Sequence, residues 1–192
     1  MPANVIVFAG AIHDRYLSAL WKTFFDRSFY RGHAPSLIGK QIGFIVSGPL
    51  SQLANLRQIL TAWTELQRSN LVGFVSDEGG DAAAVDTLLA ALAENLIRCA
   101  VEGYISPRSF LGVGGQKLFR DEIWGPPRAV FQADHRAYKR LGIYDFPQHN
   151  WGVRALNAAA TVLFKIPKVR EMVYGQMKEQ MVAPYKKVIE GA

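Results

Sequence analysis

Three segments rich in small and polar residues each follow an apolar run of strand length, and they are the parts of the chain best suited to binding a ligand. In an open parallel sheet, ligands bind beyond the carboxyl ends of the strands. Small residues there let backbone amides approach a planar or anionic group. The predicted site takes Ala9, Gly10, Ala11, Ile12, His13 and Tyr16 from the first segment, Ser47, Gly48, Pro49 and Leu50 from the second, and Asp77 and Gly79 from the third.

Strands that would bring these segments to one edge are predicted over Val5–Phe8, Ile42–Val46 and Leu71–Val75. None of these runs alternates with polar residues, which is typical of central parallel strands buried on both faces. Longer stretches of helical period separate the runs, so the pattern is βαβ. We therefore predict an α/β fold with a parallel sheet, and we expect the three segments to converge on one edge of it.

The helical stretches carry apolar stripes that must cover the sheet. A third helix is predicted after the third strand, with Asp81 as its N-cap. Its inner side is expected to carry Val85, Leu88, Leu89, Leu92 and Leu96. In the first two helices, the large side chains expected to be mostly buried are Trp21, Phe24, Phe25, Leu56, Leu60 and Trp63.

Near Ser106 the alternation of strand-length and helical runs gives way to mainly helical segments. This change divides the chain into an α/β unit over 1–105 and a helical extension over 106–192. The run Gly112-Val113-Gly114-Gly115 lacks the third glycine of a dinucleotide fingerprint and is interpreted as a turn. Mainly helical segments follow it. We expect at least two helices of ten or more residues after 115, packed on the α/β unit because their apolar side chains are too many to leave hydrated.

The composition is that of a globular protein, with 49% hydrophobic and 20% charged residues. No export signal or apolar stretch long enough to cross a bilayer is recognised, so we expect a cytoplasmic protein without a transmembrane segment. The single cysteine, Cys99, excludes an intrachain disulfide. The net charge of +6 arises entirely after residue 126. Since no run of like charges there exceeds two residues, a solvated helical face is favoured over nucleic-acid or anionic-membrane binding.

Residues after the first predicted strand carry a likeness to a known family. The small-residue segment leads into a helix with Lys22, Asp26 and Arg27, and the second strand ends in the turn Ser47-Gly48-Pro49. This order resembles the NAD(P)H-dependent FMN reductase and iron–sulfur flavoprotein branch of the flavodoxin-like proteins. The resemblance implies a flavodoxin-like sheet, FMN held by the three segments, NAD(P)H as co-substrate and electron transfer to an unidentified acceptor.

The resemblance covers about the second half of a flavodoxin-type domain together with the C-terminal helical extension. The sheet of a complete flavodoxin-type domain runs in the order 2-1-3-4-5. Only its last three strands are recognisable here, so the loop that grips the FMN phosphate in the family has no counterpart. A flavodoxin-like module without cofactor, serving interaction or dimerisation in a larger protein, is therefore the alternative function.

Several individual residues could serve either a structural role or a role in the site. Lys22 and Asp26 are spaced i, i+4, and an exposed helix pair is favoured over a role in chemistry. His13 follows a strand and is as well suited to a site as to the surface. No histidine pair has the spacing of a metal site on one helix, so no metal is expected. Because the sequence has neither a nucleophile elbow nor a Walker loop, no catalytic side chain is assigned and cofactor chemistry remains the simplest enzyme hypothesis.

The first strand is predicted to lie at an edge of the sheet. Val5–Phe8 is uniformly apolar and lacks the charges and prolines by which proteins protect exposed edges. We therefore expect this strand to pair with a second chain, either an identical subunit in a homodimer or another polypeptide that completes the sheet.

Overall fold

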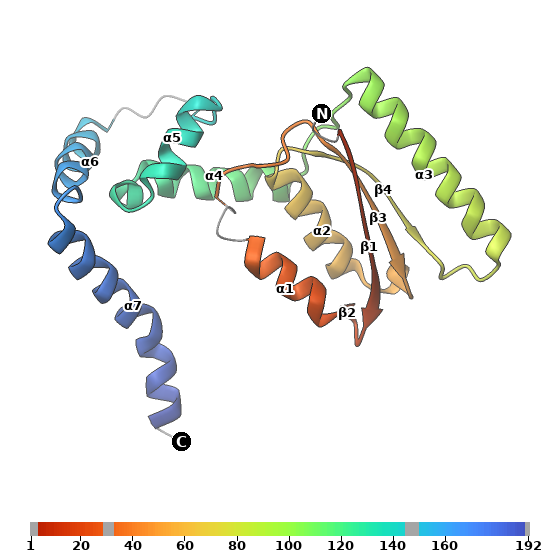
Figure 1. Ribbon diagram of the computed structural model, residues 1–192, viewed down its shortest axis with the longest axis horizontal. Coiled ribbons are helices and arrows are strands. Elements are labelled where there is room, and N and C mark those ends of the chain that lie inside the picture. Colours follow the sequence, from red (N-terminus) through yellow and green to blue (C-terminus); the bar gives the residue numbers. More distant parts are fainter. Residues whose placement is uncertain (1–3, 29–32, 145–149, 191–192) are drawn as a thin grey trace. The chain divides into compact units, whose positions relative to one another are not determined.

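The computed structural model describes residues 4–28, 33–144 and 150–190 (Figure 1). The chain divides into two compact units, Met1–Phe119 and Arg120–Ala192. The first unit contains the sheet and is α/β, as predicted. The described residues of the second unit are mainly helical. The predicted division into domains at residue 106 stays a prediction.

The sheet of the first unit has the strand order β2-β1-β3-β4. Strands β1 (Val5–His13), β3 (Gln41–Ser47) and β4 (Asn70–Ser76) are parallel, which confirms the three predicted strands and their direction. The additional strand β2 (Tyr16–Leu17) pairs antiparallel with the end of β1. The carboxyl ends of the three parallel strands therefore lie at one edge, as expected.

The first strand is longer than the apolar run that predicted it. Ala9, Gly10 and Ala11 were expected in a loop, but they pair with Ile45, Val46 and Ser47 of β3 and continue the ladder. The connection to β2 is only the two residues Asp14 and Arg15. Small residues fit a strand wherever a neighbouring strand supplies the hydrogen bonds, so their composition alone was a poor loop signal.

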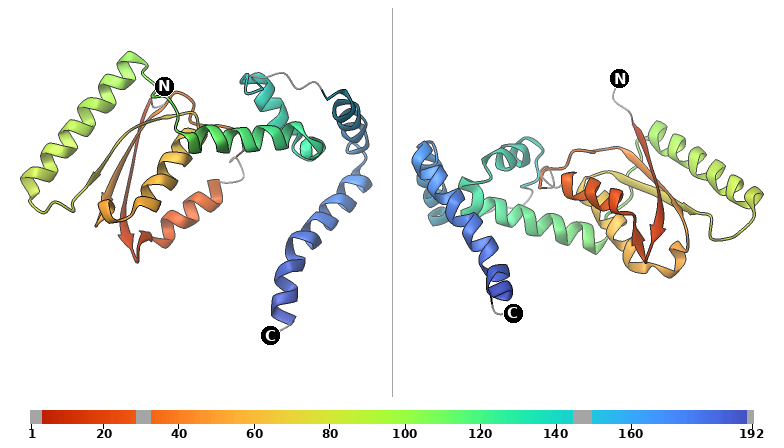
Figure 2. Two further views of the ribbon diagram at one scale, coloured as in Figure 1. Left: turned by 180° about the vertical axis from the view of Figure 1, so that it is seen from behind. Right: turned by 60° about the horizontal axis from the view of Figure 1, so that its bottom comes forward.

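Helices cover the two faces of the sheet unequally (Figures 1 and 2). Helices α1 (Ala19–Ser28) and α2 (Ala54–Leu66) lie on one face, and α3 (Ala82–Glu102) lies on the other. A short 3-10 turn, η2 (Leu50–Gln52), precedes α2. The predicted cap is confirmed, because the Asp81 carboxylate accepts a hydrogen bond from the Ala84 amide at 3.0 Å.

A row of phenylalanines runs across the sheet on the face of α1 and α2. The parallel register places Phe8 beside Phe44 and Phe44 beside Phe74. The ring centroids are 5.5 Å and 5.3 Å apart, in stacked arrangements. On the other face, Leu92 and Leu96 of α3 are buried over the sheet.

The predicted burial of the helices is confirmed at the centre of the sheet and fails toward its ends. Leu56 and Leu60 of α2 are 1% and 0% exposed, while Trp21, Phe25 and Trp63 are half-buried. Phe24 is 43% exposed, and Leu88 of α3 is 51% exposed, so both assignments were wrong. Phe24 lies beside β1, on whose outer side the only strand among the described residues is β2, which pairs with Ile12 and His13 alone.

The glycine run after residue 111 is helical, which corrects its interpretation as a turn. It lies within α4 (Phe110–Trp124). A Cβ at Gly112 would collide with the Glu65 side chain of α2, and one at Gly115 would lie 3.1 Å from Leu66. The glycines therefore serve close helix packing. The Glu65 carboxylate also accepts hydrogen bonds from the Ser109 amide and hydroxyl, at 3.0 Å and 2.6 Å.

The second unit contains η3 (Pro126–Ala129), α5 (Gln132–Arg140), α6 (Trp151–Leu163) and α7 (Pro167–Glu190). Helices α6 and α7 confirm the expectation of two long helices after 115. Within this unit, His135 Nδ1 lies 2.8 Å from the Tyr144 hydroxyl. Burial lowers the pKa of His135 to about 4 and raises that of Tyr144 to about 12, so both are neutral at pH 7. Packing of the extension on the α/β unit stays a prediction.

Candidate functional site at the carboxyl edge of the sheet

Hydrogen bonds hold the ends of β3 and β4 together. The Asp77 carboxylate accepts bonds from the Ser47 hydroxyl at 2.6 Å and from the Gly48 amide at 2.7 Å. The Ser76 hydroxyl donates to the Gly48 carbonyl at 2.7 Å. Gly48 has a φ of +115°, a conformation that only glycine adopts without strain. The second and third predicted segments therefore form one connected loop cluster.

The first segment reaches the same cluster through Ile12. A Cβ at Gly48 would lie 3.1 Å from the Ile12 Cβ, so the end of β1 packs directly against the loop after β3. A cavity of about 350 Å³ opens here, lined by Ile12, Arg15, Pro49, Gln52 and Leu53. This volume is at the small end of the range for ligand pockets. Two of the predicted site residues, Ile12 and Pro49, thus line a pocket at the predicted edge.

Acidic side chains already occupy the loop amides that were expected to bind an anion. Glu78 accepts hydrogen bonds from the Ser51 hydroxyl and amide. These bonds lower the pKa of Glu78, as the bonds from Ser47 and Gly48 lower that of Asp77. Both groups are therefore carboxylates at neutral pH. A phosphate would meet two negative charges at this position in place of free donors, so the cluster is not a phosphate site.

Several predicted site residues lie away from the pocket. The Ala9 carbonyl accepts a hydrogen bond from Trp21 Nε1 at 3.1 Å, and the same indole covers Gly10. Leu50 is 3% exposed and belongs to the core. His13 is exposed and pairs with Tyr16 at the hairpin end. Ala11 pairs with Ser47 within the sheet, and Gly79 lies in the exposed turn after β4.

Three residues of the pocket were missed by sequence reasoning: Arg15, Gln52 and Leu53. Arg15 was seen only as part of a predicted loop. The other two belong to the short turn and cap that precede α2, which the helical stripe of that segment did not reveal. A cation in the segment between an apolar strand and the helix that follows it was the available signal for Arg15.

The turn that carries Arg15 is strained. Asp14 and Arg15 have φ values of +47° and +67°, and such two-residue hairpin turns strongly prefer Asn-Gly or Asp-Gly. Arginine in this conformation costs about 1–2 kcal/mol. Strain of this kind is often retained where a side chain is needed, and Arg15 lines the pocket.

Replacing Arg15 with glycine is therefore expected to stabilise the α/β unit by up to about 1 kcal/mol, because the relief of strain exceeds the entropy cost of glycine. Urea unfolding of wild type and Arg15→Gly measures this change. Arg98→Gln, on the exposed side of α3, removes the same charge and should leave the free energy of unfolding unchanged within about 0.5 kcal/mol. A variant less stable than wild type would show that Arg15 makes a stabilising contact.

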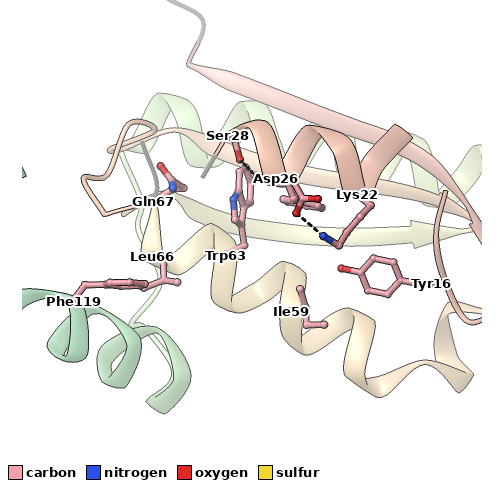
Figure 3. Close-up of a pocket in the computed structure, with 10 residues that line it drawn as sticks. Tyr16, Lys22, Asp26, Ser28, Ile59, Trp63, Leu66, Gln67 and Phe119 are labelled. Atoms are coloured by element: carbon pink, nitrogen blue, oxygen red, sulfur yellow. Dashed lines mark hydrogen bonds and ion pairs between the residues drawn. The ribbon is translucent and has the colours of Figure 1, made fainter. Parts of the chain in front are cut away.

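A second groove lies between α1 and α2 (Figure 3). Lys22 and Asp26 form an i, i+4 ion pair on α1, with both side chains 60% exposed, and the Tyr16 hydroxyl points toward this pair. The pair bears out the favoured reading of these residues as an exposed helix pair. Because its charges are already matched, the groove presents mainly apolar walls, which include Phe25, Ile59, Trp63, Leu66 and Phe119.

No family model matches the chain, and no match was found among the curated proteins or the solved structures. The resemblance to flavodoxin-like reductases therefore stays a prediction. Within the described parts of the chain, no group of His, Cys, Asp and Glu side chains could hold a metal ion. In the same parts, no helix has the length and apolar character needed to cross a membrane.

Proposed function

We propose that this chain is a flavodoxin-like domain of an FMN-dependent oxidoreductase, in which the pocket beside Ile12, Arg15 and Pro49 receives the flavin ring. The observation that carries this proposal is the position of the pocket. It lies at the carboxyl edge of a parallel sheet, where the ends of β1 and β3 meet. Ligands of open α/β sheets bind at this edge.

The pocket suits one part of the cofactor and not the other. Ile12, Pro49 and Leu53 offer apolar surface for a planar ring, and Arg15 offers a cation at its margin. The phosphate has no such place, because the amides of Gly48 and Ser51 already donate to carboxylates. The phosphate must therefore be held by residues outside this loop cluster, or by a second polypeptide.

A bound flavin would supply the redox chemistry, taking a hydride from NAD(P)H and passing electrons to an acceptor. The contribution of this chain is to hold and polarise the ring. A cation close to a flavin ring stabilises the negative charge that the ring gains on reduction. Arg15 is suited to this role, which explains why a strained turn keeps an arginine.

Titration with riboflavin and with FMN, followed by flavin fluorescence, tests the proposal. Since the chain offers a ring pocket without a phosphate anchor, the two flavins are expected to bind with Kd values within about threefold of each other, a difference under about 1 kcal/mol. Arg15→Gly should weaken both, whereas Arg98→Gln should weaken neither. No binding of either flavin would overturn the proposal, and strong preference for FMN would locate a phosphate site that the loop cluster does not provide.

A module without cofactor is the second candidate, and the carboxylates on the loop amides favour it. Asp77 and Glu78 satisfy the loop donors from within the chain, so the edge is complete without a ligand. Such a domain would serve interaction through its surfaces. It would bind neither flavin in the titration above and would still associate with a partner.

A further inference from the structure

Strand β1 presents an open row of backbone groups on the side away from β3. The Asn4 carbonyl accepts the Gln41 amide of β3, so the even-numbered residues of β1 turn their peptide groups toward β3. Successive residues alternate, and Val5 and Val7 therefore turn theirs outward. No strand among the residues that the structure describes pairs with this outer side before Ile12.

The indole of Trp21 closes the open row at its carboxyl end. It donates to the Ala9 carbonyl, which belongs to the outward set, and it packs over Gly10. Further along the strand, His13 and Ile12 pair with β2. The part of the edge left for another strand is therefore short and centred on Ile6.

The surface around this open edge is apolar on both sides. A groove of about 280 Å³ runs beside it, lined by Val7, Phe8, Ala9, Leu20, Trp21 and Phe24. Val7 is 46% exposed, Leu20 is 82% exposed and Phe24 is 43% exposed. None of the groove residues is charged, so the groove lacks the lysines and other charges that normally keep an edge strand from pairing.

We propose that a second copy of the chain occupies this edge, with the two β1 strands antiparallel about a two-fold axis at Ile6. Val5 of each copy then lies opposite Val7 of the other, and each such pair exchanges two N–H···O bonds. This register uses only the outward groups that are open and leaves the Ala9 carbonyl with Trp21. Longer overlaps would require the Ala9 carbonyl and bring the indole against the incoming strand.

A second copy also matches the side chains of this surface. A two-fold axis perpendicular to the sheet keeps both α1 helices on the same face, so Leu20 and Phe24 of one copy approach those of the other. A charged strand placed on this uncharged groove would lose hydration without gaining an ion pair, so an uncharged strand fits best. Strand β1 of a second copy is such a strand, because it has no charged residue from Val5 through Ile12. Self-pairing of this kind is isologous and closes as a dimer. Pairing at the open edge of β1 does not depend on flavin binding.

Sedimentation velocity across micromolar concentrations tests the dimer with two matched variants. Val7→Lys places a charge on the open edge and is expected to raise the dimer dissociation constant by at least about tenfold. Val101→Lys makes the same change at an exposed valine of α3, 83% exposed, and should leave the dimer intact. A monomeric wild type, or a Val7→Lys variant that dimerises as well as wild type, would overturn the proposal.

Disulfide trapping tests the register independently, in a Cys99→Ser background. Ile6 would face its own counterpart in a non-hydrogen-bonded pair, with Cα atoms about 4.5 Å apart, a separation that a disulfide spans. Oxidised Ile6→Cys should therefore run as a covalent dimer. Asn4→Cys should not, because Asn4 would lie opposite Phe8. Cross-linking of Asn4→Cys without that of Ile6→Cys would contradict the proposed register.

Discussion

Phe44→Ala is expected to lower the free energy of unfolding of the α/β unit by about 3–5 kcal/mol, the usual cost of deleting a buried phenylalanine. Phe44 is 1% exposed and lies at the centre of the row across the sheet. It stacks between Phe8 and Phe74, so its loss opens a cavity that strands on both sides hold open. Since whole domains are stable by only about 5–15 kcal/mol, this one change should remove a large part of the total.

Urea unfolding followed by far-UV circular dichroism measures the effect of Phe44→Ala. Phe110→Ala is the matched control, because Phe110 begins α4 and is 88% exposed. The control should change the free energy of unfolding by less than about 0.5 kcal/mol. Equal effects of the two substitutions would mean that the aromatic row contributes nothing to stability beyond ordinary surface contacts.

The parallel core could be predicted from the sequence because strand and helix periods differ and the apolar runs were strong. Val5–Phe8, Ile42–Val46 and Leu71–Val75 each lie within an observed strand. The phenylalanine row could not be predicted, because it depends on register. Local sequence does not determine which residue of one strand faces which residue of the next.

Two runs of small residues were wrongly predicted to be loop or turn, and the physical reason is the same for both. Ala9-Gly10-Ala11 is strand and Gly112–Gly115 is helix, although both were interpreted as loop or turn. In each place, small side chains make room for a distant group, the Trp21 indole or the Glu65 side chain. A tertiary contact of this kind cannot be recognised from the local sequence, so small residues that serve close packing are predicted as loops or turns.

The candidate site was predicted in its position and only in part in its members. The carboxyl edge follows from the parallel strands, and Ile12 and Pro49 line the pocket there. Asp77 was expected to contact a ligand, yet it binds the neighbouring loop. A carboxylate after a strand can bind either a ligand or the amides of a neighbouring loop. Only the distance between Asp77 and Gly48 in the folded protein shows that the loop is its partner.

A buried polar network at the opposite end of the sheet leads to the second large prediction. Asn70 and Gln41 begin β4 and β3 and are 2% and 1% exposed. Asn70 Nδ2 donates to Gln41 Oε1 at 2.6 Å, and Asn70 Oδ1 accepts the Ser106 amide at 2.9 Å. Gln41 Nε2 donates in turn to the Tyr104 carbonyl at 3.1 Å. The network therefore ties the segment after α3 to the starts of both strands.

Asn70→Leu should destabilise the α/β unit by about 2–4 kcal/mol, because it leaves the buried side-chain carbonyl of Gln41 and the half-buried Ser106 amide without their partners. Urea unfolding measures this loss, and Asn55→Leu on the exposed side of α2 is the control, with an expected change below about 0.5 kcal/mol. The double variant Gln41→Met, Asn70→Leu should recover part of the loss, since removing both polar groups avoids one unsatisfied carbonyl. The single variant Gln41→Met completes the comparison. If the free energy lost by the double variant equals the sum of the losses of Gln41→Met and Asn70→Leu, the two side chains act independently and the network has no stabilising role as a unit.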